Sequence, residues 1–374
     1  MKHKVRILLV HLVSLGDCLF VTALARQIKQ DYPDCHLTWA ISNRCSQIIQ
    51  NNPYVDEIWE IFSENMSENY GSAWEQTKKE AILKKEKKLY DYLFFTQIFP
   101  DNISNYDGTT RSSTFRNYPN PITVPISPII VLNEKEIENV QTFARKHKLQ
   151  EFRRVILFEC SPQSGQSPVN TDFALELSKK IVDKFEDCVV LLTSNQKIIT
   201  GHPHIIDASG ITFRENAELS KYCDLLIGCS SGITWLLTST WAKKIPTIQI
   251  LNKKSSEFTF ASVSYDLKYW GESIHHIIEI TKPEHQYILN CIEMTLEEGV
   301  EKARNKYNEE LKPNVASLEE IIRILIFKKE WEKIIKVSKN FYDRNKNPFV
   351  IAVVPYAIVK TLIIILLSII KRKQ

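Results

Sequence analysis

The stretch "VRILLVHLVSLGDCLF", residues 5–20, joins an apolar run to a polar turn that contains a glycine and an acid. An apolar run such as 5–10 is typical of a strand buried on both faces of a parallel sheet. Apolar residues recur at helical spacing over 21–28, so a helix follows the turn. Asp17 therefore lies at the sheet edge where open α/β folds bind ligands. It is either a helix cap or a catalytic carboxylate, and Gly16 beside it would let a substrate approach the backbone closely.

The same alternation of strand and helix patterns continues along the chain. "HLTWAIS" (36–42) and "VDEIWEIF" (55–62) have strand character and are separated by a short helical segment. The polar stretch 101–128 has the composition of a long loop. After it the pattern restarts at "RRVILFEC" (153–160). We predict an α/β fold with two Rossmann-like, doubly wound parallel-sheet domains facing a cleft.

Composition shifts divide the chain into four segments. We predict an N-terminal Rossmann-like acceptor domain (1–130), a second Rossmann-like donor domain (131–283), a helical extension (284–347) and a hydrophobic tail (348–374). Apolar residues in the extension form a helical stripe at Leu318, Ile321, Ile322 and Leu325. This stripe would pack either on the second domain or on a membrane.

The tail "FVIAVVPYAIVKTLIIILLSII", residues 349–370, is close to the length of a membrane span. Pro355 and Lys360 interrupt it, and basic residues flank both of its ends. We expect a monotopic or re-entrant anchor on a membrane surface, with a single span and a helix packed on the enzyme's own domains as alternatives.

Composition and absent motifs exclude several classes of protein. The 374 residues carry a net charge of only +4, so we expect no nucleic-acid partner. Eight cysteines without a C-x-x-C pair indicate reduced thiols of a cytosolic protein. There is no G-x-G-x-x-G, no P-loop and no D-x-D, so neither a standard dinucleotide site nor an acidic metal site is expected.

Two further polar turns follow strands of the second domain. "IGCSSGITW" (227–235) would place Ser230, Ser231 and Gly232 at a helix N-terminus, which either holds a phosphate or is an ordinary serine cap. "CSPQSGQSP" (160–168) is either a surface turn or a loop that offers N–H groups and hydroxyls to an anion. Its candidate donors are Gln163, Ser164, Gly165, Gln166 and Ser167.

Residues 4–250 resemble glycosyltransferase family 9, the lipopolysaccharide heptosyltransferase family of GT-B fold. "ILLVHLVSLGDCLFVTALARQIKQDYPDCHLTWAI" resembles the strand, S-L-G-D turn and helix of that family, and "NPYVDEIWEI" resembles its next segment. "IIDASGITFRENAELSKYCDLLIGCSSGITWLL" is similar to the stretch that leads to the family's D-S/T-G-x-x-H donor motif.

The resemblance implies an inverting, metal-independent transfer of a sugar from a nucleotide diphosphate sugar, usually ADP-heptose, to a lipid-linked saccharide, with no further cofactor. Asp17 matches the catalytic base of the family. The chain departs from the donor motif, because Ser230 replaces an aspartate and Trp235 a histidine, and Ser167 lies near the place of a lysine. The diphosphate would therefore be held by neutral donors, and Trp235 is more typical of a core residue.

We therefore expect a membrane-associated glycosyltransferase of lipopolysaccharide biosynthesis on the cytoplasmic face of the inner membrane. Arg44 and Arg111 are candidates for binding acceptor phosphates. A non-catalytic GT-B-like protein that binds a nucleotide sugar or scaffolds glycan assembly is the alternative. A sugar-nucleotide epimerase of GT-B fold is a third interpretation, and the hydrophobic tail argues against it.

Overall fold

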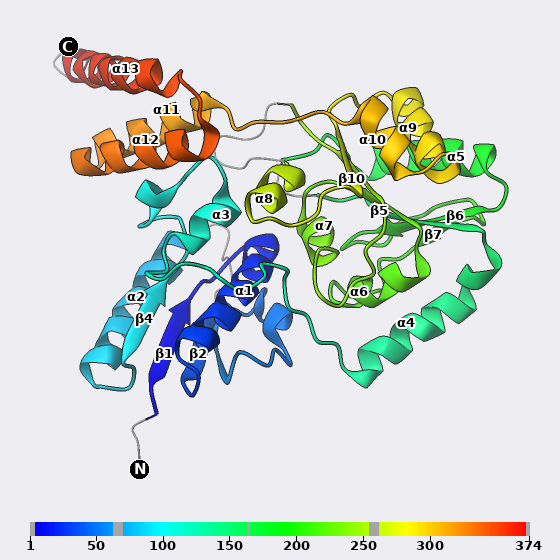
Figure 1. Cartoon of the computed structure of the whole chain (residues 1–374), viewed down its shortest axis with the longest axis horizontal. Helices are drawn as coiled ribbons and strands as arrows, with labels where there is room; N and C mark the ends of the chain where they lie inside the picture. Colours follow the sequence, from blue (N-terminus) through cyan, green and yellow to red (C-terminus); the bar gives the residue numbers. More distant parts are fainter. Residues whose placement is uncertain (1–3, 63–69, 163–164, 254–261, 372–374) are drawn as a thin grey trace.

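The computed structural model describes residues 4–62, 70–162, 165–253 and 262–371, which form two parallel α/β lobes followed by C-terminal helices (Figure 1). The first lobe contains a four-stranded parallel sheet in the order β3-β2-β1-β4. Its strands are β1 (Arg6–Val10), β2 (His36–Ser42), β3 (Glu57–Ile61) and β4 (Tyr92–Phe95). Its longer helices are α1 (Leu15–Asp31) and α2 (Tyr70–Glu86), and a short 3-10 helix, η1, spans Ser46–Ile49.

The apolar run of β1 explains why helices cover both faces of this sheet. Ile7 and Leu9 belong to the apolar cluster that contains α1, whereas Leu8 and Val10 pack with Trp74 of α2. Successive side chains of a strand point to opposite faces. The predicted doubly wound arrangement is thus confirmed.

The second lobe contains a six-stranded parallel sheet in the order β10-β9-β8-β5-β6-β7. Its strands are β5 (Arg154–Glu159), β6 (Cys188–Thr193), β7 (Ile205–Asp207), β8 (Leu225–Gly228), β9 (Thr247–Ile250) and β10 (Ile277–Ile280). Its helices are α4 (Glu134–Lys146), α5 (Thr171–Lys184), α6 (Glu215–Leu219), α7 (Gly232–Leu236), α8 (Val263–Tyr269), α9 (His285–Glu297) and α10 (Val300–Tyr307). The sequence patterns did not predict β7, β10 or α8.

The two lobes share one apolar core. Leu9 and Phe20 of the first lobe belong to the same buried cluster as Leu157, Leu191 and Trp235 of the second. Helix α1 packs against α7 across this contact. The predicted cleft is therefore closed by direct contact at this point.

The polar stretch 101–128 is not simply a loop, which corrects the prediction. It contains the 3-10 helix η2 (Ile103–Asn105) and the helix α3 (Thr110–Phe115), and the residues of α3 from Arg111 onwards are buried. Its polar side chains bond to one another and to the second lobe, so the segment is buried in spite of its composition.

The helices after residue 283 divide by what they pack on. Helices α9 and α10 pack on the second lobe. Helices α11 (Val315–Phe327), α12 (Trp331–Asn345) and α13 (Val350–Lys371) instead form a cluster with Ile103 and Tyr106 of the first lobe. The apolar stripe of α11 is fully buried in this cluster, so it lies neither on the second lobe nor on a free surface, contrary to both alternatives drawn from the sequence.

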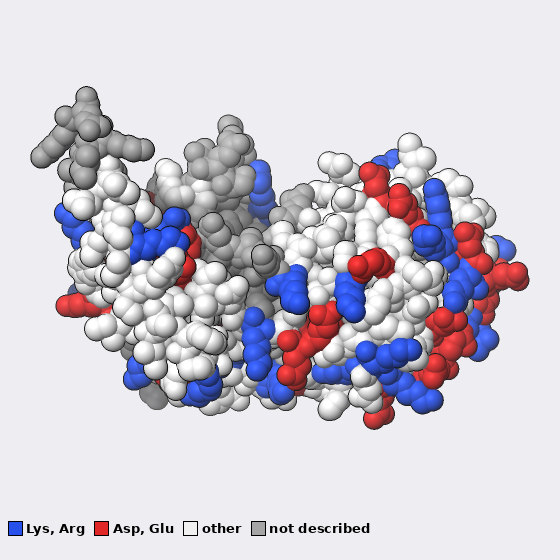
Figure 2. All heavy atoms as spheres, turned by 90° about the horizontal axis from the view of Figure 1, so that it is seen from above, with Lys and Arg blue, Asp and Glu red and all other residues white. Residues whose placement is uncertain are grey.

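Helix α13 has one packed face and one exposed apolar face. On the packed face Ala357 and Thr361 are buried, and Lys360 Nζ lies 2.6 Å from Glu319 Oε1 of α11. The exposed large apolar residues on and beside this helix are Phe349, Ile351, Tyr356, Val359, Leu362, Ile363, Ile364, Leu366 and Leu367. By length and composition, Val350–Leu367 could cross a membrane, with a mean hydropathy of 2.6. Figure 2 shows mostly uncharged surface at this end of the molecule and interleaved charges at the other.

Candidate functional site

Asp17 lies in the first turn of α1, directly after the carboxyl end of β1, as predicted. The turn is made by Ser14, whose φ of 72° is in the left-handed region, and the backbone N–H of Cys18 donates to Ser14 O at 2.8 Å. The Asp17 side chain keeps 14% of its surface exposed.

Arg111 of α3 is the cation beside Asp17. Arg111 Nε lies 3.5 Å from Asp17 Oδ1. Burial raises the pKa of Asp17, the charge of Arg111 lowers it, and the carboxylate of Asp266 raises it again. Opposing effects of this kind are common where a carboxylate acts as a base.

Arg111 does not lie on an exposed loop, where the sequence placed it. Only 10% of its side chain is exposed, and its guanidinium carbon lies 4.2 Å from the centre of the Trp235 ring. A Cβ atom on Gly16 would come within 3.1 Å of Arg111 Nη2 and 3.4 Å of Trp235 Cδ1. The glycine thus allows these two side chains, rather than a substrate, to approach the backbone. Trp235 is fully buried, as expected for a core residue.

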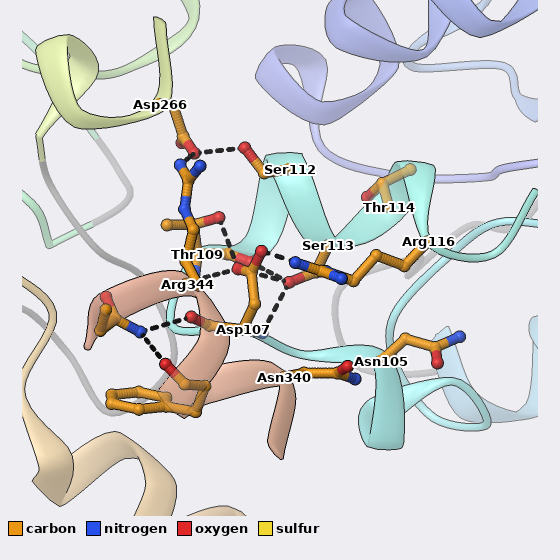
Figure 3. A network of polar contacts seen from close by, with 12 residues as sticks. Asn105, Asp107, Thr109, Ser112, Ser113, Thr114, Arg116, Asp266, Asn340 and Arg344 are labelled. Atoms are coloured by element: carbon orange, nitrogen blue, oxygen red, sulfur yellow. Dashed lines mark hydrogen bonds and ion pairs between the residues drawn. The ribbon is translucent and has the colours of Figure 1, made fainter. Parts of the chain in front are cut away.

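A network of polar contacts positions α3 (Figure 3). Asp107 Oδ1 accepts hydrogen bonds from Thr109 N at 3.1 Å, Thr109 Oγ1 at 2.9 Å and Ser113 Oγ at 2.9 Å. Ser112 Oγ donates to Asp266 Oδ1 of α8 at 2.6 Å. Helix α3 is therefore held by Asp107, which precedes it, and by the second lobe.

The C-terminal extension reaches the same network. Arg344 Nη2 of α12 lies 3.4 Å from Asp266 Oδ1, and Asn345 Nδ2 donates to Asp107 O at 2.7 Å. Figure 3 shows Arg344 pointing towards Asp266, on the side opposite Asn105. The helix that carries Arg111 is thus in contact with both lobes and with the extension.

The turn between β8 and α7 faces α1 from the second lobe. Ser230 has a φ of 52°, its N–H donates to Gln249 Oε1 at 2.7 Å, and its buried Oγ has no hydrogen-bond partner in the described structure. Ser231 is the N-cap of α7. A Cβ atom on Gly232 would meet Phe213 Cε2 at 2.8 Å, so this glycine permits close packing.

Glu159 occupies the N-terminal end of α7, which corrects the expectation of free N–H groups there. This residue ends β5 and is 3% exposed. Its carboxylate accepts hydrogen bonds from Cys229 N at 2.9 Å, Ile233 N at 3.0 Å and Thr234 Oγ1 at 2.7 Å. A phosphate on the axis of α7 would meet this buried carboxylate. A carboxylate at the end of a strand has no distinctive local pattern, so the sequence did not reveal this role.

The loop after β5 lies at the same sheet edge. Gln163 and Ser164 lie outside the described residues. Gly165 has a φ of 68°, and its carbonyl accepts a hydrogen bond from Asn252 Nδ2 at 2.9 Å. Gln166 is buried, and Ser167 Oγ accepts a hydrogen bond from Val169 N at 3.2 Å. The loop is therefore braced against the residues that follow β9.

Arg44 is exposed on the turn after β2 and lies at the carboxyl edge of the first sheet.

Four buried polar atoms around the lobe contact make no hydrogen bond to the described part of the chain. They are Arg111 Nε, Trp235 Nε1, Ser230 Oγ and Gln249 Nε2. Buried donors are normally satisfied, so Trp235 Nε1, Ser230 Oγ and Gln249 Nε2 are available to acceptor atoms of a ligand, whereas Arg111 Nε faces the Asp17 carboxylate. Among the described residues no three His, Cys, Asp or Glu side chains are grouped as metal ligands.

The solved structures with a similar fold include two glycosyltransferases. The glycosyl transferase family 9 protein of Veillonella parvula is 13% identical, with a TM-score of 0.51, over 80% of this chain and 94% of that one. The ADP-heptose lps heptosyltransferase II of E. coli is 15% identical, with a TM-score of 0.51, over 78% of this chain and 99% of that one. No protein-family model and no curated protein sequence matches this chain. The two parallel-sheet lobes of this protein therefore have the GT-B fold of family 9 glycosyltransferases.

Proposed function

We propose that this protein is an inverting, metal-independent glycosyltransferase that moves a sugar, heptose or a related one, from a nucleotide diphosphate sugar to a lipid-linked or lipopolysaccharide-type acceptor. The observation that carries the proposal is the pairing of Asp17 with Arg111 at 3.5 Å, where the carboxyl edge of the first sheet meets the second lobe. The fold shared with an ADP-heptose heptosyltransferase makes ADP the first nucleotide to test.

In the proposed reaction Asp17 accepts the proton of an acceptor hydroxyl while that oxygen attacks the anomeric carbon. The new C–O bond forms on the face opposite the leaving group, and the nucleotide diphosphate departs with the electron pair of the broken bond. Because Glu159 occupies the axis of α7, the diphosphate would be held from the side of that helix by the neutral donor Ser231, while Arg111 stays a candidate for acceptor phosphates. Gln166 and Ser167 are proposed as further neutral hydrogen-bond donors to the diphosphate.

The proposal is tested by the Asp17→Asn variant, which keeps the size of the side chain and removes the proton acceptor. Transfer, or slow donor hydrolysis, is measured with ADP-, GDP-, UDP- and CMP-sugars, with and without EDTA. We expect a loss of about a hundredfold or more in turnover, with donor affinity nearly unchanged. Asp34→Asn, an exposed acid just after α1, is the matched control. An Asp17→Asn enzyme of near wild-type rate would show that Asp17 is a helix cap.

Glu159 favours one alternative, a non-catalytic scaffold of glycan assembly. A buried carboxylate at the end of α7 removes the anion site that a diphosphate would use. Calorimetry with the same nucleotide sugars separates the two functions. Binding followed by turnover supports the enzyme, whereas the absence of both supports the scaffold.

We further propose that the protein acts at the cytoplasmic face of the inner membrane, where α13 serves as a peripheral or monotopic anchor. The exposed apolar face of α13 is the support for this placement. The ion pair between Lys360 and Glu319 joins α13 to α11 and favours a helix that lies on the surface over one that spans the bilayer.

A further inference from the structure

A cavity lies outside the Asp17 site. Its volume is about 240 Å³, and it is enclosed by α8, β10, the connection from α10 to α11 and the end of α12. In Figure 1 that connection runs along the upper edge of the molecule, between the second lobe and the extension. None of the residues proposed for sugar transfer lines this cavity.

The inner wall of the cavity has hydrogen-bond donors without partners. The Arg344 side chain is 1% exposed, and its guanidinium carbon lies 3.3 Å from the centre of the Tyr269 ring. Its Nε and Nη1 make no hydrogen bond to any described residue, although Nη2 faces Asp266. Ser264 N donates to the buried carboxylate of Glu279 at 2.8 Å. The unpartnered Nε and Nη1 of Arg344 carry a cost unless a ligand or water satisfies them.

The outer wall of the cavity carries three basic and three acidic residues. Lys268, Arg304 and Lys312 line it, and none of them forms an ion pair within the described structure. Two acids of the wall are already engaged by the protein. Glu279 accepts hydrogen bonds from Ser262 Oγ at 2.6 Å and Val263 N at 2.7 Å, and Glu309 accepts them from Thr281 N at 2.9 Å and Thr281 Oγ1 at 2.8 Å. The exposed Glu310 is the remaining carboxylate.

We propose that this cavity binds a phosphate group, with Arg344 as its inner donor and Arg304 and Lys312 as its outer ones. Guanidinium groups match phosphate oxygens geometrically and keep their charge when buried. Tyr269 and Leu311 provide apolar surface for the part of the ligand that carries the phosphate. The ligand is a phospholipid headgroup or a small soluble phosphate ester. This proposal does not depend on the sugar-transfer reaction.

The test uses the double variant Arg304→Gln/Lys312→Gln, which leaves the buried Arg344 in place. Titration calorimetry measures the binding of inorganic phosphate and of monomeric dihexanoyl phosphatidic acid to the full-length protein. We expect the double variant to bind at least about tenfold more weakly than the wild type. Lys179→Gln/Lys180→Gln, two exposed lysines of α5 with no ion pair in the described structure, is the control of equal charge change and should bind as the wild type does.

The two probes identify the source of the phosphate. Tighter binding of the phosphatidic acid than of phosphate, lost in the double variant, assigns the cavity to a lipid headgroup. Equal binding of both, lost in the same variant, assigns it to a soluble phosphate ester. Failure of the wild type to bind either probe, or equal loss in the control variant, overturns the proposal. Neither result bears on sugar transfer at Asp17.

Discussion

Asp17 experiences electrostatic effects of opposite sign from neighbours on different elements. Burial and the carboxylate of Asp266 raise its pKa, while the guanidinium of Arg111 lowers it. A general base must be ionised, so the rate of transfer should fall as the pH drops through this pKa. The pH at which the rate falls on the acidic limb therefore depends on the opposing effects of Arg111 and Asp266 on the pKa of Asp17.

We predict that removing these neighbours moves the acidic limb in opposite directions. Arg111→Gln removes a cation that favours ionised Asp17, so the limb should shift to higher pH. Asp266→Asn removes an anion, so the limb should shift to lower pH. The measurement is kcat/KM against pH, or a carbon NMR titration of the Asp17 carboxyl. Shifts in the same direction in both variants would contradict this model of the site.

At this scale the sequence identified the acid but not its partners. Asp17 follows a strand and precedes a helix, and both patterns are local, so its place could be predicted. Arg111, Glu159 and Asp266 reach the site only because distant segments pack together. The spacing of residues along the chain contains no information on such contacts.

The local patterns were reliable for long elements and failed for short ones. The apolar runs of β1 and β5 and the strand pattern of β2 were predicted, and the structure contains each of them. Strands β7 and β10 have three and four residues, too few for a periodic pattern to stand out. Helix α3 was missed because its serines and threonines are typical of a loop, and only tertiary hydrogen bonds make its burial favourable.

Helix α3 depends on Asp107, whose carboxylate accepts hydrogen bonds from three buried donors. We predict that Asp107→Ala leaves those donors unsatisfied and lowers the free energy of unfolding by about 3 kcal/mol. Because Arg111 lies on this helix, the variant should also weaken the pairing with Asp17. Urea denaturation measures the first effect and the pH profile the second. Asp34→Ala serves as the exposed control, and an equal loss of stability in that variant would refute a specific role for Asp107.

At the scale of the whole molecule, Arg214, a buried arginine of the second lobe, links the two lobes. Arg214 is 2% exposed, and its Nη1 donates to Gln47 O at 2.8 Å and Gln50 O at 3.0 Å in the first lobe. Its Nε donates to Glu136 Oε1 of α4 at 2.7 Å. These contacts, with the shared apolar core, fix the lobes relative to each other.

We predict that Arg214→Gln lowers the free energy of unfolding by about 3 kcal/mol, because it breaks a largely buried ion pair and leaves backbone carbonyls without donors. Proteolysis in the connection near residue 131 should also become faster than in the wild type. Arg145→Gln, on the exposed surface of α4, is the control. Wild-type stability and cleavage rate in the Arg214 variant would show that the apolar core alone holds the lobes together.

At the scale of the molecule, the extension packs on the first lobe, the side proposed to bind the acceptor, and α13 covers α11 while its other, apolar face is exposed. A truncation after Asn347 would remove that face but would also uncover apolar residues of α11 that α13 covers. A sharper test changes only outward-facing residues, such as Ile351 and Ile363, which are 77% and 51% exposed. These substitutions leave the packed face of α13 intact.

We predict that Ile351→Glu/Ile363→Glu weakens binding to anionic vesicles at least about tenfold, since burying a carboxylate in the interface costs several kcal/mol. Binding is measured by co-sedimentation with phosphatidylglycerol vesicles and compared with phosphatidylcholine vesicles. Ile199→Glu, an 88% exposed apolar residue of the second lobe, is the control and should bind as the wild type does. Protease added to one side of sealed vesicles shows on which side a C-terminal tag lies. A tag that is cleaved only from the periplasmic side indicates a span, and a tag that is cleaved from the cytoplasmic side indicates an anchor on the surface. If the full-length protein remains soluble without detergent and binds to neither kind of vesicle, α13 is not a membrane anchor.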